Sequence, residues 1–348
     1  MAGVEGYEPI ENPRAIVRAV DGRAKVLAEI KNYWPKLRFL LSAIMLVLII
    51  PHIRLSTILP QGKAAIKLLL FATLIALVGI LLSILRWQRV LAALGVKRSP
   101  LSLVKMYFAA LFVSNFLPST IGGDVARASW LSLQIPGDGD AVASVVLERF
   151  SGWLVLPLIT LAGLVINPHL LRLGSATRLA VVLALVTLLA MFGCVLFAFW
   201  AGPKEGGSRF KVRMYIESIR LGLVRVVRSP RRMLEVLAVS LMYQLVVVAS
   251  AFEITNTIYL TLSWTVMLAF VPAVAILQVV PVTFGGLGLR EGAFILFLRP
   301  LGVSTSHAIE LGLLVYTINL ALSLLGAPAF AMGQRSRQRE SIETEVGL

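Results

Sequence analysis

Eight apolar segments dominate the sequence, and each has the composition of a helix that enters a lipid bilayer. A transmembrane helix needs about 20 mainly apolar residues, because the hydrocarbon core of a bilayer is about 30 Å thick. The segments cover residues 37–53, 64–85, 101–117, 141–166, 178–200, 233–259, 263–280 and 307–332. Two further stretches, 122–133 and 286–298, have helical patterns but are too short to span. Together they predict an all-α polytopic membrane protein.

Composition supports this class and excludes several others. Hydrophobic residues make up 58% of the 348-residue chain and charged residues 15%, whereas soluble proteins average about 45–50% and about 25%. The single cysteine, Cys194, excludes an internal disulfide and a cysteine-based metal site, and the three histidines lack the spacing of metal ligands. We therefore expect no metal and no cofactor.

The net charge of +15 is explained by orientation in a membrane, and we do not expect nucleic-acid binding. Lys and Arg gather in four stretches: seven in residues 1–38, five in 86–105, nine in 201–232 and three in the tail after residue 333. Cytoplasmic loops of membrane proteins carry an excess of these residues. We predict that all four stretches, and therefore both termini, are cytoplasmic in a cell inner membrane.

These charges also restrict how often the chain crosses the membrane. If all eight long segments crossed once, the stretch with nine basic residues would lie outside. The count agrees with the charges if residues 101–133 and 263–298 each enter the bilayer and return as a helical hairpin. We therefore predict about six full spans and two re-entrant hairpins. The chain is thus predicted to have a basic arm at 1–36, a transmembrane domain at 37–332 and a tail at 333–348. Within the transmembrane domain, the basic connector at 201–232 is predicted to carry a helix at 210–227 that lies on the membrane surface.

The two predicted hairpins share the pattern Pro-x-Thr-x-Gly-Gly-x-x-x-Arg. The matching positions lie 163 residues apart: Asn115 with the chemically similar Gln278, Pro118 with Pro281, Thr120 with Thr283, Gly122 with Gly285, Gly123 with Gly286 and Arg127 with Arg290. The charge count gives the matched segments opposite orientations. We therefore predict an inverted-topology repeat, with one copy at about 37–166 and the other at about 178–332, an architecture of secondary transporters.

Each motif has the features of an anion site at the start of a short helix. Pro ends the incoming helix, and the two glycines permit a sharp turn and a close approach. The unpaired N–H groups and the positive dipole end of the next helix favour anions. Arg127 and Arg290 add a positive charge about one turn on, where an ionisable side chain is costly and usually functional. A simpler alternative is that the motif only makes a turn and that the arginine pairs with a carboxylate.

Four other charged residues complete the candidate site. Asp124 lies three residues before Arg127 on one helix face and can pair with it, while Glu148 and Arg149 lie inside an apolar span and must face protein or water. Alternatively, Asp124 and Glu148 carry a coupling proton. The candidate substrate-binding residues are Arg127, Arg290, Asp124, Glu148, Arg149, Glu291, Thr120, Thr283, Gly122, Gly123, Gly285, Gly286, Asn115 and Gln278.

Three stretches of the sequence resemble a known family. SNFLPSTIGGDVARASWL, VVLERFSGW and VPVTFGGLGLREGAF are similar to the transmembrane region of the lysylphosphatidylglycerol synthase/flippase family, and the resemblance covers about residues 36–332. It implies a multi-pass bacterial or archaeal inner-membrane protein of the flippase-like type. The best-known member moves a lysyl-modified phospholipid between leaflets, and others are tied to cell-surface glycan or lipid assembly. The soluble aminoacyl-transferase domain of the full synthase has no counterpart here, so we do not expect lysyl transfer.

Three functions remain open on the sequence alone. We favour a transporter, not an enzyme, that moves a lipid with an anionic or zwitterionic headgroup between leaflets; a lipid-linked glycan precursor and an aminoacylated phospholipid both fit. The second function is a membrane-embedded headgroup transferase that uses Asp124, Glu148 or Glu291 as general base. The third is a non-transporting partner of a cell-envelope biosynthesis enzyme. The expected partners are thus the membrane lipid, and either a second copy of the chain or such an enzyme.

Overall fold

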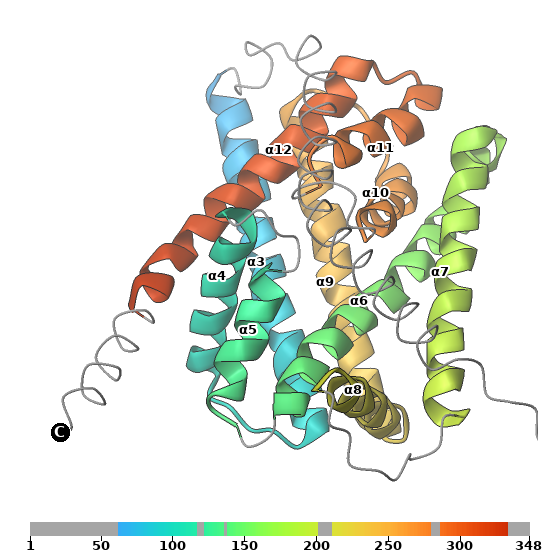
Figure 1. Ribbon diagram of the computed structural model, residues 1–348. Coiled ribbons are helices and arrows are strands. Elements are labelled where there is room, and N and C mark those ends of the chain that lie inside the picture. The colour runs from blue at the N-terminus through green and yellow to red at the C-terminus, as the bar shows by residue number, and fades with distance from the viewer. Residues whose placement is uncertain (1–61, 117–121, 136–137, 201–210, 280–285, 333–348) are drawn as a thin grey trace, which may run out of the picture.

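The computed structural model describes residues 62–116, 122–135, 138–200, 211–279 and 286–332, and these ranges contain helices and no strand. The all-α class is therefore confirmed (Figure 1). The α-helices are α3 (Lys63–Leu94), α4 (Pro100–Phe116), α5 (Gly122–Ser132), α6 (Asp138–Ile166), α7 (Ser175–Trp200), α8 (Lys211–Val227), α9 (Pro230–Thr257), α10 (Trp264–Gln278), α11 (Leu289–Leu298) and α12 (Thr305–Ser323).

Five of the described helices are long and apolar enough to cross a membrane. They are Lys63–Leu94, Gly139–Ile166, Ser175–Trp200, Pro230–Thr257 and Thr305–Met332, and they coincide with five of the six predicted full spans. The sixth, residues 37–53, lies outside the described residues, as do the basic arm and the tail. Helices α4, α5, α10 and α11 have 17, 11, 15 and 10 residues, which is short for a span. The two re-entrant hairpins stay a prediction.

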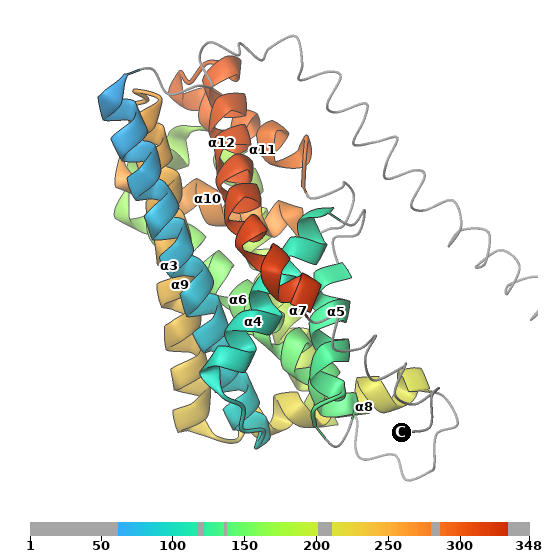
Figure 2. The ribbon, with the colours of Figure 1, turned by 90° about the vertical axis from the view of Figure 1, so that its left-hand side faces the viewer.

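Helices α3 and α9 pack against each other along one side of the bundle and run antiparallel, side by side in both ribbon views (Figures 1 and 2). The Ser250 hydroxyl donates a hydrogen bond to the carbonyl of Ala72 at 3.0 Å, near the start of α3. At the other end, Arg232 donates to the carbonyl of Ala93 at 3.1 Å. These contacts join the end of each helix to the start of the other, which fixes the opposite directions.

The helix order α3 to α6 recurs as α9 to α12, close to the spacing of 163 residues found in the motifs. The packing recurs as well, because α6 lies against α10 while α12 and the short helix Leu324–Gly326 lie against α4. Each of these two helix crossings has a glycine at the point of contact, Gly163 in one and Gly326 in the other, and the two glycines lie 163 positions apart. A methyl group on Gly163 would lie 2.6 Å from the backbone nitrogen of Ala269, and one on Gly326 would lie 1.9 Å from the carbonyl oxygen of Phe108.

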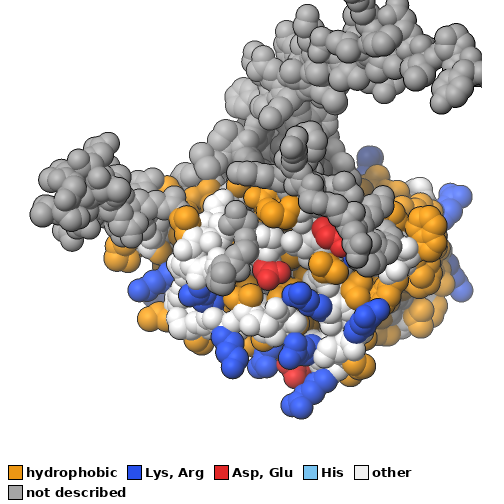
Figure 3. Space-filling view, turned by 60° about the horizontal axis from the view of Figure 1, so that its bottom comes forward, with side chains coloured by type: hydrophobic (Ala, Val, Ile, Leu, Met, Phe, Trp, Pro, Cys, Tyr) orange, Lys and Arg blue, Asp and Glu red, His pale blue; other side chains and the backbone are white. Residues whose placement is uncertain are grey.

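Helix α8 lies across one end of the bundle, nearly end-on in Figure 1 and crosswise in Figure 2. The predicted helix in the basic connector is thus present. It packs against α6, where a methyl group on Gly222 would lie 2.9 Å from Leu147. Lys and Arg side chains gather on this end of the molecule (Figure 3). The exposed ones are Arg89, Lys97, Lys105, Arg225, Arg228, Arg231 and Arg232.

We expect Gly326→Ala and Gly163→Ala to destabilise the protein by about 1–3 kcal/mol each, because the added methyl group meets backbone that cannot move aside. The measurement is the thermal unfolding midpoint of the purified protein in detergent. Gly193→Ala is the matched control, since a methyl group there meets nothing within 4 Å. If all three variants unfold at the wild-type temperature, the close crossings are wrong.

Candidate functional site

The site is built around the carboxylate of Glu148 on α6, which is fully buried. One carboxylate oxygen is bound by Arg86 and Ser83 of α3, with the serine hydroxyl at 3.2 Å. The other accepts from Arg127 of α5 at 2.9 Å. A buried carboxylate is stable only when it is paired and hydrogen-bonded, and three side chains from two neighbouring helices satisfy Glu148.

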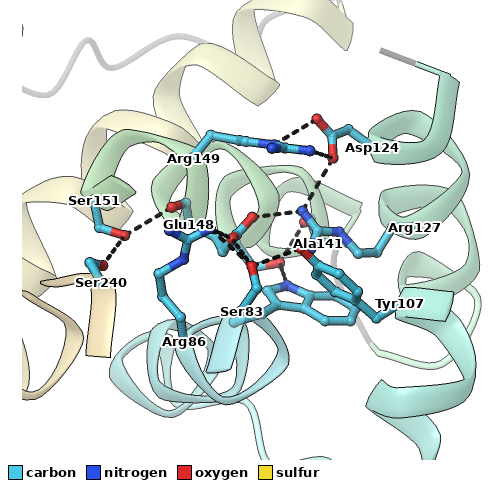
Figure 4. Close-up of polar contacts among 12 residues, drawn as sticks. Ser83, Arg86, Tyr107, Asp124, Arg127, Ala141, Glu148, Arg149, Ser151 and Ser240 are labelled. Atoms are coloured by element: carbon cyan, nitrogen blue, oxygen red, sulfur yellow. Dashed lines mark hydrogen bonds and ion pairs between the residues drawn. The ribbon is translucent and has the colours of Figure 1, made fainter. Parts of the chain in front are cut away.

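From Glu148 a chain of alternating charges leads outward (Figure 4). Arg127 also lies 3.3 Å from Asp124. Arg149 binds Asp124 with two parallel hydrogen bonds, from Nε and Nη2, both at 3.0 Å. The order is therefore Arg86, Glu148, Arg127, Asp124 and Arg149. Because three arginines meet two carboxylates, this group, which we name the charge cluster, has one positive charge in excess.

Aromatic rings hold the two inner arginines in place. The guanidinium carbon of Arg127 lies 4.6 Å from the ring centre of Trp87 and 4.9 Å from that of Tyr107, and only 2% of the residue is exposed. Arg86 lies 4.6 Å from the ring centre of Tyr243. Such cation–π contacts stabilise a cation that has lost its water. Arg127 is thus fixed within the protein and supports its neighbours.

Gly152 makes room for Arg86, because a methyl group there would lie 2.6 Å from its Nη1. Trp87 is fixed in turn by a hydrogen bond that its indole nitrogen donates to Ser144 at 3.1 Å. The Tyr107 and Ser83 hydroxyls lie 2.7 Å apart. The inner part of the charge cluster is therefore held by packing and hydrogen bonds from α3, α4 and α6.

The outer part of the charge cluster borders a small pocket. The side chain of Arg149 is 43% exposed and that of Asp124 is 22% exposed, whereas Glu148 is fully buried. The pocket has a volume of about 20 Å³ and is lined by Tyr107, Ala110, Leu111, Ser114, Gly123, Asp124, Arg127 and Arg149. The exposure of Arg149 therefore makes the Asp124–Arg149 pair the part of the charge cluster that a ligand can contact, while the pocket beside it has room for about one water molecule.

Gly123 brings α5 against α4 beside this pocket. A methyl group on it would lie 1.9 Å from the Ser114 hydroxyl and 2.3 Å from the Ala110 carbonyl oxygen. The second glycine of the first motif thus serves close helix packing, one of the two roles that the sequence indicated.

The second motif forms a separate group on α10, α11 and α12. Arg290 donates from Nε and Nη2 to the side-chain oxygen of Gln278, at 3.3 and 3.2 Å, and lies 5.6 Å from the ring centre of Tyr316. Gly286 adopts a positive φ of 76°, which favours glycine. Glu291 is fully buried and accepts a hydrogen bond from the backbone N–H of Gly288 at 2.6 Å.

The structure divides the predicted residues that it describes between two separate groups, so Arg127 and Arg290 do not share one site. Asp124, Arg127, Glu148 and Arg149 meet in the charge cluster, and the pairing of Asp124 with Arg127 is present. The side-chain amide of Asn115 donates to the carbonyl of Leu111 in its own helix. Gly122 begins α5. Thr120, Thr283 and Gly285 lie outside the described residues.

Sequence reasoning missed Arg86, which it placed at the start of a connector. The structure corrects this, because α3 continues to Leu94 and Arg86 is only 2% exposed. A signal was present in the sequence: Trp87, Val90, Leu91 and Leu94 follow helical spacing and are all buried. No sequence pattern marked Ser83, Tyr107 or Tyr243 as part of the site, because single hydroxyl side chains are common in membrane spans.

The model of one protein family, described as the lysylphosphatidylglycerol synthase TM region, matches residues 37–326. The chain belongs to this family. No curated protein and no solved structure matches it. Membership in the lysylphosphatidylglycerol synthase TM region family supports a multi-pass, flippase-like membrane protein whose function is related to lipids.

We expect Glu148→Gln to destabilise the protein by about 3–5 kcal/mol, because two buried arginines lose the carboxylate that they share. Thermal unfolding in detergent measures this loss. Glu235→Gln is the control, since Glu235 and Arg89 form an ion pair at 3.3 Å with side chains 40% and 46% exposed. Exposed pairs contribute at most about 1 kcal/mol. Equal unfolding temperatures for the two variants would contradict the role of Glu148.

Proposed function

We propose that this protein moves a lipid with a phosphate-bearing, anionic or zwitterionic headgroup between the two leaflets of a cell inner membrane. The headgroup binds at the Asp124–Arg149 end of the charge cluster. The observation that carries the proposal is the excess of one arginine in a cluster that lies inside a membrane domain and is open at Arg149. Membership of a lipid-related family supports it.

The charge cluster replaces the interactions with water that a headgroup loses when it enters the membrane. A charged group in the hydrocarbon core is costly unless the protein replaces its hydration with fixed partners. A guanidinium binds phosphate with two parallel hydrogen bonds, which is the geometry that Arg149 now offers to Asp124. A phosphate that takes the place of Asp124 at Arg149 balances the excess positive charge, so anion binding is favoured.

The repeated helix order supports an inverted-topology repeat around this site. Helices α3 and α9 occupy matching positions in the two halves and run antiparallel. If the other pairs are related in the same way, α5 and α11 begin at opposite sides of the site. Helix ends that meet near the midplane are how many secondary transporters hold a substrate.

Basic residues orient the molecule. Among the residues whose side chains are described, the α8 end exposes seven Lys and Arg side chains, and the opposite end exposes Lys63, Lys67, Arg172, Arg178 and Arg299. We therefore place the α8 end on the cytoplasmic side.

The carboxylates of the charge cluster favour transport over a transferase. A general base must be able to take up a proton from the substrate. Glu148 is bound by two arginines, and Asp124 is bound by two as well. Both carboxylates are therefore already engaged by cations, so neither is free to contact the reacting proton of a substrate.

The test is exchange of fluorescent phospholipids between leaflets of vesicles that contain the purified protein, read by a membrane-impermeant quencher. We expect Arg149→Gln to slow exchange several-fold, because the exposed phosphate ligand is lost while the buried part of the charge cluster remains. Arg149→Lys should recover part of the rate, since it keeps the charge but not the two parallel hydrogen bonds. Arg172→Gln, an exposed arginine at the other end, is the control.

Full exchange by a folded Arg149→Gln variant would disprove this site. If the wild-type protein exchanges no phospholipid and no lipid-linked precursor, the proposed transport is wrong. A covalently changed lipid would then indicate the transferase, and stable co-purification of an envelope enzyme would indicate the non-transporting partner.

A further inference from the structure

Helix α6 contains a proline in its interior, and this proline divides the helix into two parts. Pro157 lies inside the membrane span Gly139–Ile166. Proline has no backbone N–H, and its ring pushes against the carbonyl four residues earlier, which here is that of Trp153. The hydrogen-bond ladder of α6 therefore lacks the bond from residue 157 to Trp153, and a helix bends most easily at such a point.

A second hydrogen bond is missing one turn further along α6. Thr160 is fully buried, and its hydroxyl has no partner among the described residues. By contrast, the hydroxyls of Thr73, Thr187 and Thr317 on other helices donate to the carbonyl four residues back, at 2.8, 2.7 and 2.9 Å. A buried hydroxyl without a partner is costly. The turn after Pro157 thus holds a spare donor that a different bend of α6 can pair with a backbone carbonyl.

The part of α6 before Pro157 is fixed to the helices around the charge cluster. The carboxylate of Glu148 is bound by arginines of α3 and α5. One turn on, Ser240 of α9 donates a hydrogen bond to Ser151 at 3.1 Å (Figure 4). Arg149 lies on this same part of the helix. The charge cluster and the first part of α6 are therefore tied together and move as one unit.

The part of α6 after Pro157 is fixed to α10 instead. Gly163 crosses α10 so closely that a methyl group on it would lie 2.6 Å from the backbone nitrogen of Ala269. Just beyond the end of α6, the side-chain amide of Asn167 donates to the Thr265 hydroxyl at 2.9 Å. Pro157 therefore separates the part of α6 that belongs to the charge cluster from the part that α10 holds.

Helix α10 also contains an internal proline, Pro272, but its contacts give that proline a packing role. The carbonyl four residues before it is that of Leu268, whose carbon lies 2.9 Å from the place where a methyl group on Gly163 would stand. Pro272 thus belongs to the close crossing of the two helices. Trp153, whose carbonyl is freed by Pro157, lies nearly three turns before Gly163 and outside this crossing.

We propose that Pro157 is a hinge at which α6 bends, so that the charge cluster moves relative to α10 and Arg149 opens to one side of the membrane and then to the other. This proposal rests on the lipid transport proposed above. A headgroup that binds at Arg149 on one side must be released on the opposite side, which a rigid site cannot do. The ion pairs stay intact, because the bend lies outside the charge cluster.

The spare hydroxyl of Thr160 gives the hinge a second stable position. In the described position the hydroxyl is unpaired, and a different bend that pairs it gains a hydrogen bond. This gain offsets the packing that is lost when α6 leaves the described position. The two positions then have comparable free energies, and both are populated.

The functional test compares Pro157→Ala and Pro157→Gly in the vesicle exchange assay. Alanine restores the missing N–H and favours a straight helix, so we expect exchange to fall several-fold. Glycine restores the same N–H but weakens the helix, so Pro157→Gly should keep more of the wild-type rate than Pro157→Ala. Lost packing alone would give the opposite order, because glycine fills less space. A Pro157→Ala rate equal to wild type, or a Pro157→Gly rate below that of Pro157→Ala, overturns the proposal.

Pro230→Ala is the matched control for this series. Pro230 lies at the start of α9, where a proline breaks no hydrogen bond within the helix. We expect Pro230→Ala to exchange lipid at the wild-type rate. If it slows exchange as much as Pro157→Ala does, the effect is not specific to α6 and the hinge is rejected.

The direct test measures the distance between two spin labels by double electron–electron resonance. The labels are placed on cysteines introduced at Val146, before the hinge, and at Leu185 on α7, which packs against α10; both side chains are exposed. The only native cysteine, Cys194, is replaced by serine in this background. We expect two distances in this parent protein and one in Pro157→Ala. Thr160→Val, which keeps the shape but removes the spare donor, should also favour one. The same distance distribution in the parent and in Pro157→Ala overturns the hinge.

The two tests separate the hinge from lipid transport itself. Two distances that become one in Pro157→Ala, without any lipid exchange by the wild-type protein, would keep the hinge and reject the transport function. Wild-type exchange that is unchanged in Pro157→Ala would keep the transport function and reject the hinge.

Discussion

The burial of one carboxylate, that of Glu148, determines much of the first half of this protein. A carboxylate with no exposed surface inside an apolar bundle needs counter-charges from its neighbours. Arg86 and Arg127 supply them, and each of these arginines then needs its own support from aromatic rings. Small residues at Gly152 and Gly123 leave the space that these contacts require. Helices α3, α4, α5 and α6 are therefore tied together by a polar group rather than by apolar packing alone.

The enclosure of Glu148 determines which part of the charge cluster can bind a ligand. The buried end of the charge cluster is satisfied internally, and only its outer pair is open to a ligand. Arg127, which the motif marks as the site residue, fixes Asp124 and Glu148 and is itself enclosed. Arg149 lies next to Glu148 in the sequence and carries the accessible charge. A rigid inner shell with one exposed arginine offers a phosphate a pre-arranged partner, which lowers the cost of ordering the site on binding.

Much of the fold could be predicted from the sequence, because membrane spans are set by length and apolarity. All five described long helices fall where apolar segments predicted them. The one clear error came from a charged residue within a helix. The predicted span ended before Arg86, whereas α3 continues past it and buries Trp87 and Leu91. The motifs identified Asp124, Arg127 and Arg290. The aromatic supports could not be foreseen, because their role depends on which helices meet and not on local spacing.

The two halves of the molecule have similar backbones but different functional side chains. The helix order and the glycine crossings recur at the same spacing, so both halves position a short helix in the same way. The side chains differ: the first half has three arginines and two carboxylates in one network, and the second has Arg290 beside a single buried carboxylate. A protein without an energy source only equilibrates a lipid between leaflets, however unequal its two sides are. Net transport in one direction requires a binding site whose state is coupled to a second equilibrium. Similar backbones provide two comparable positions for a headgroup, and the different side chains make the two positions differ in how strongly they bind it.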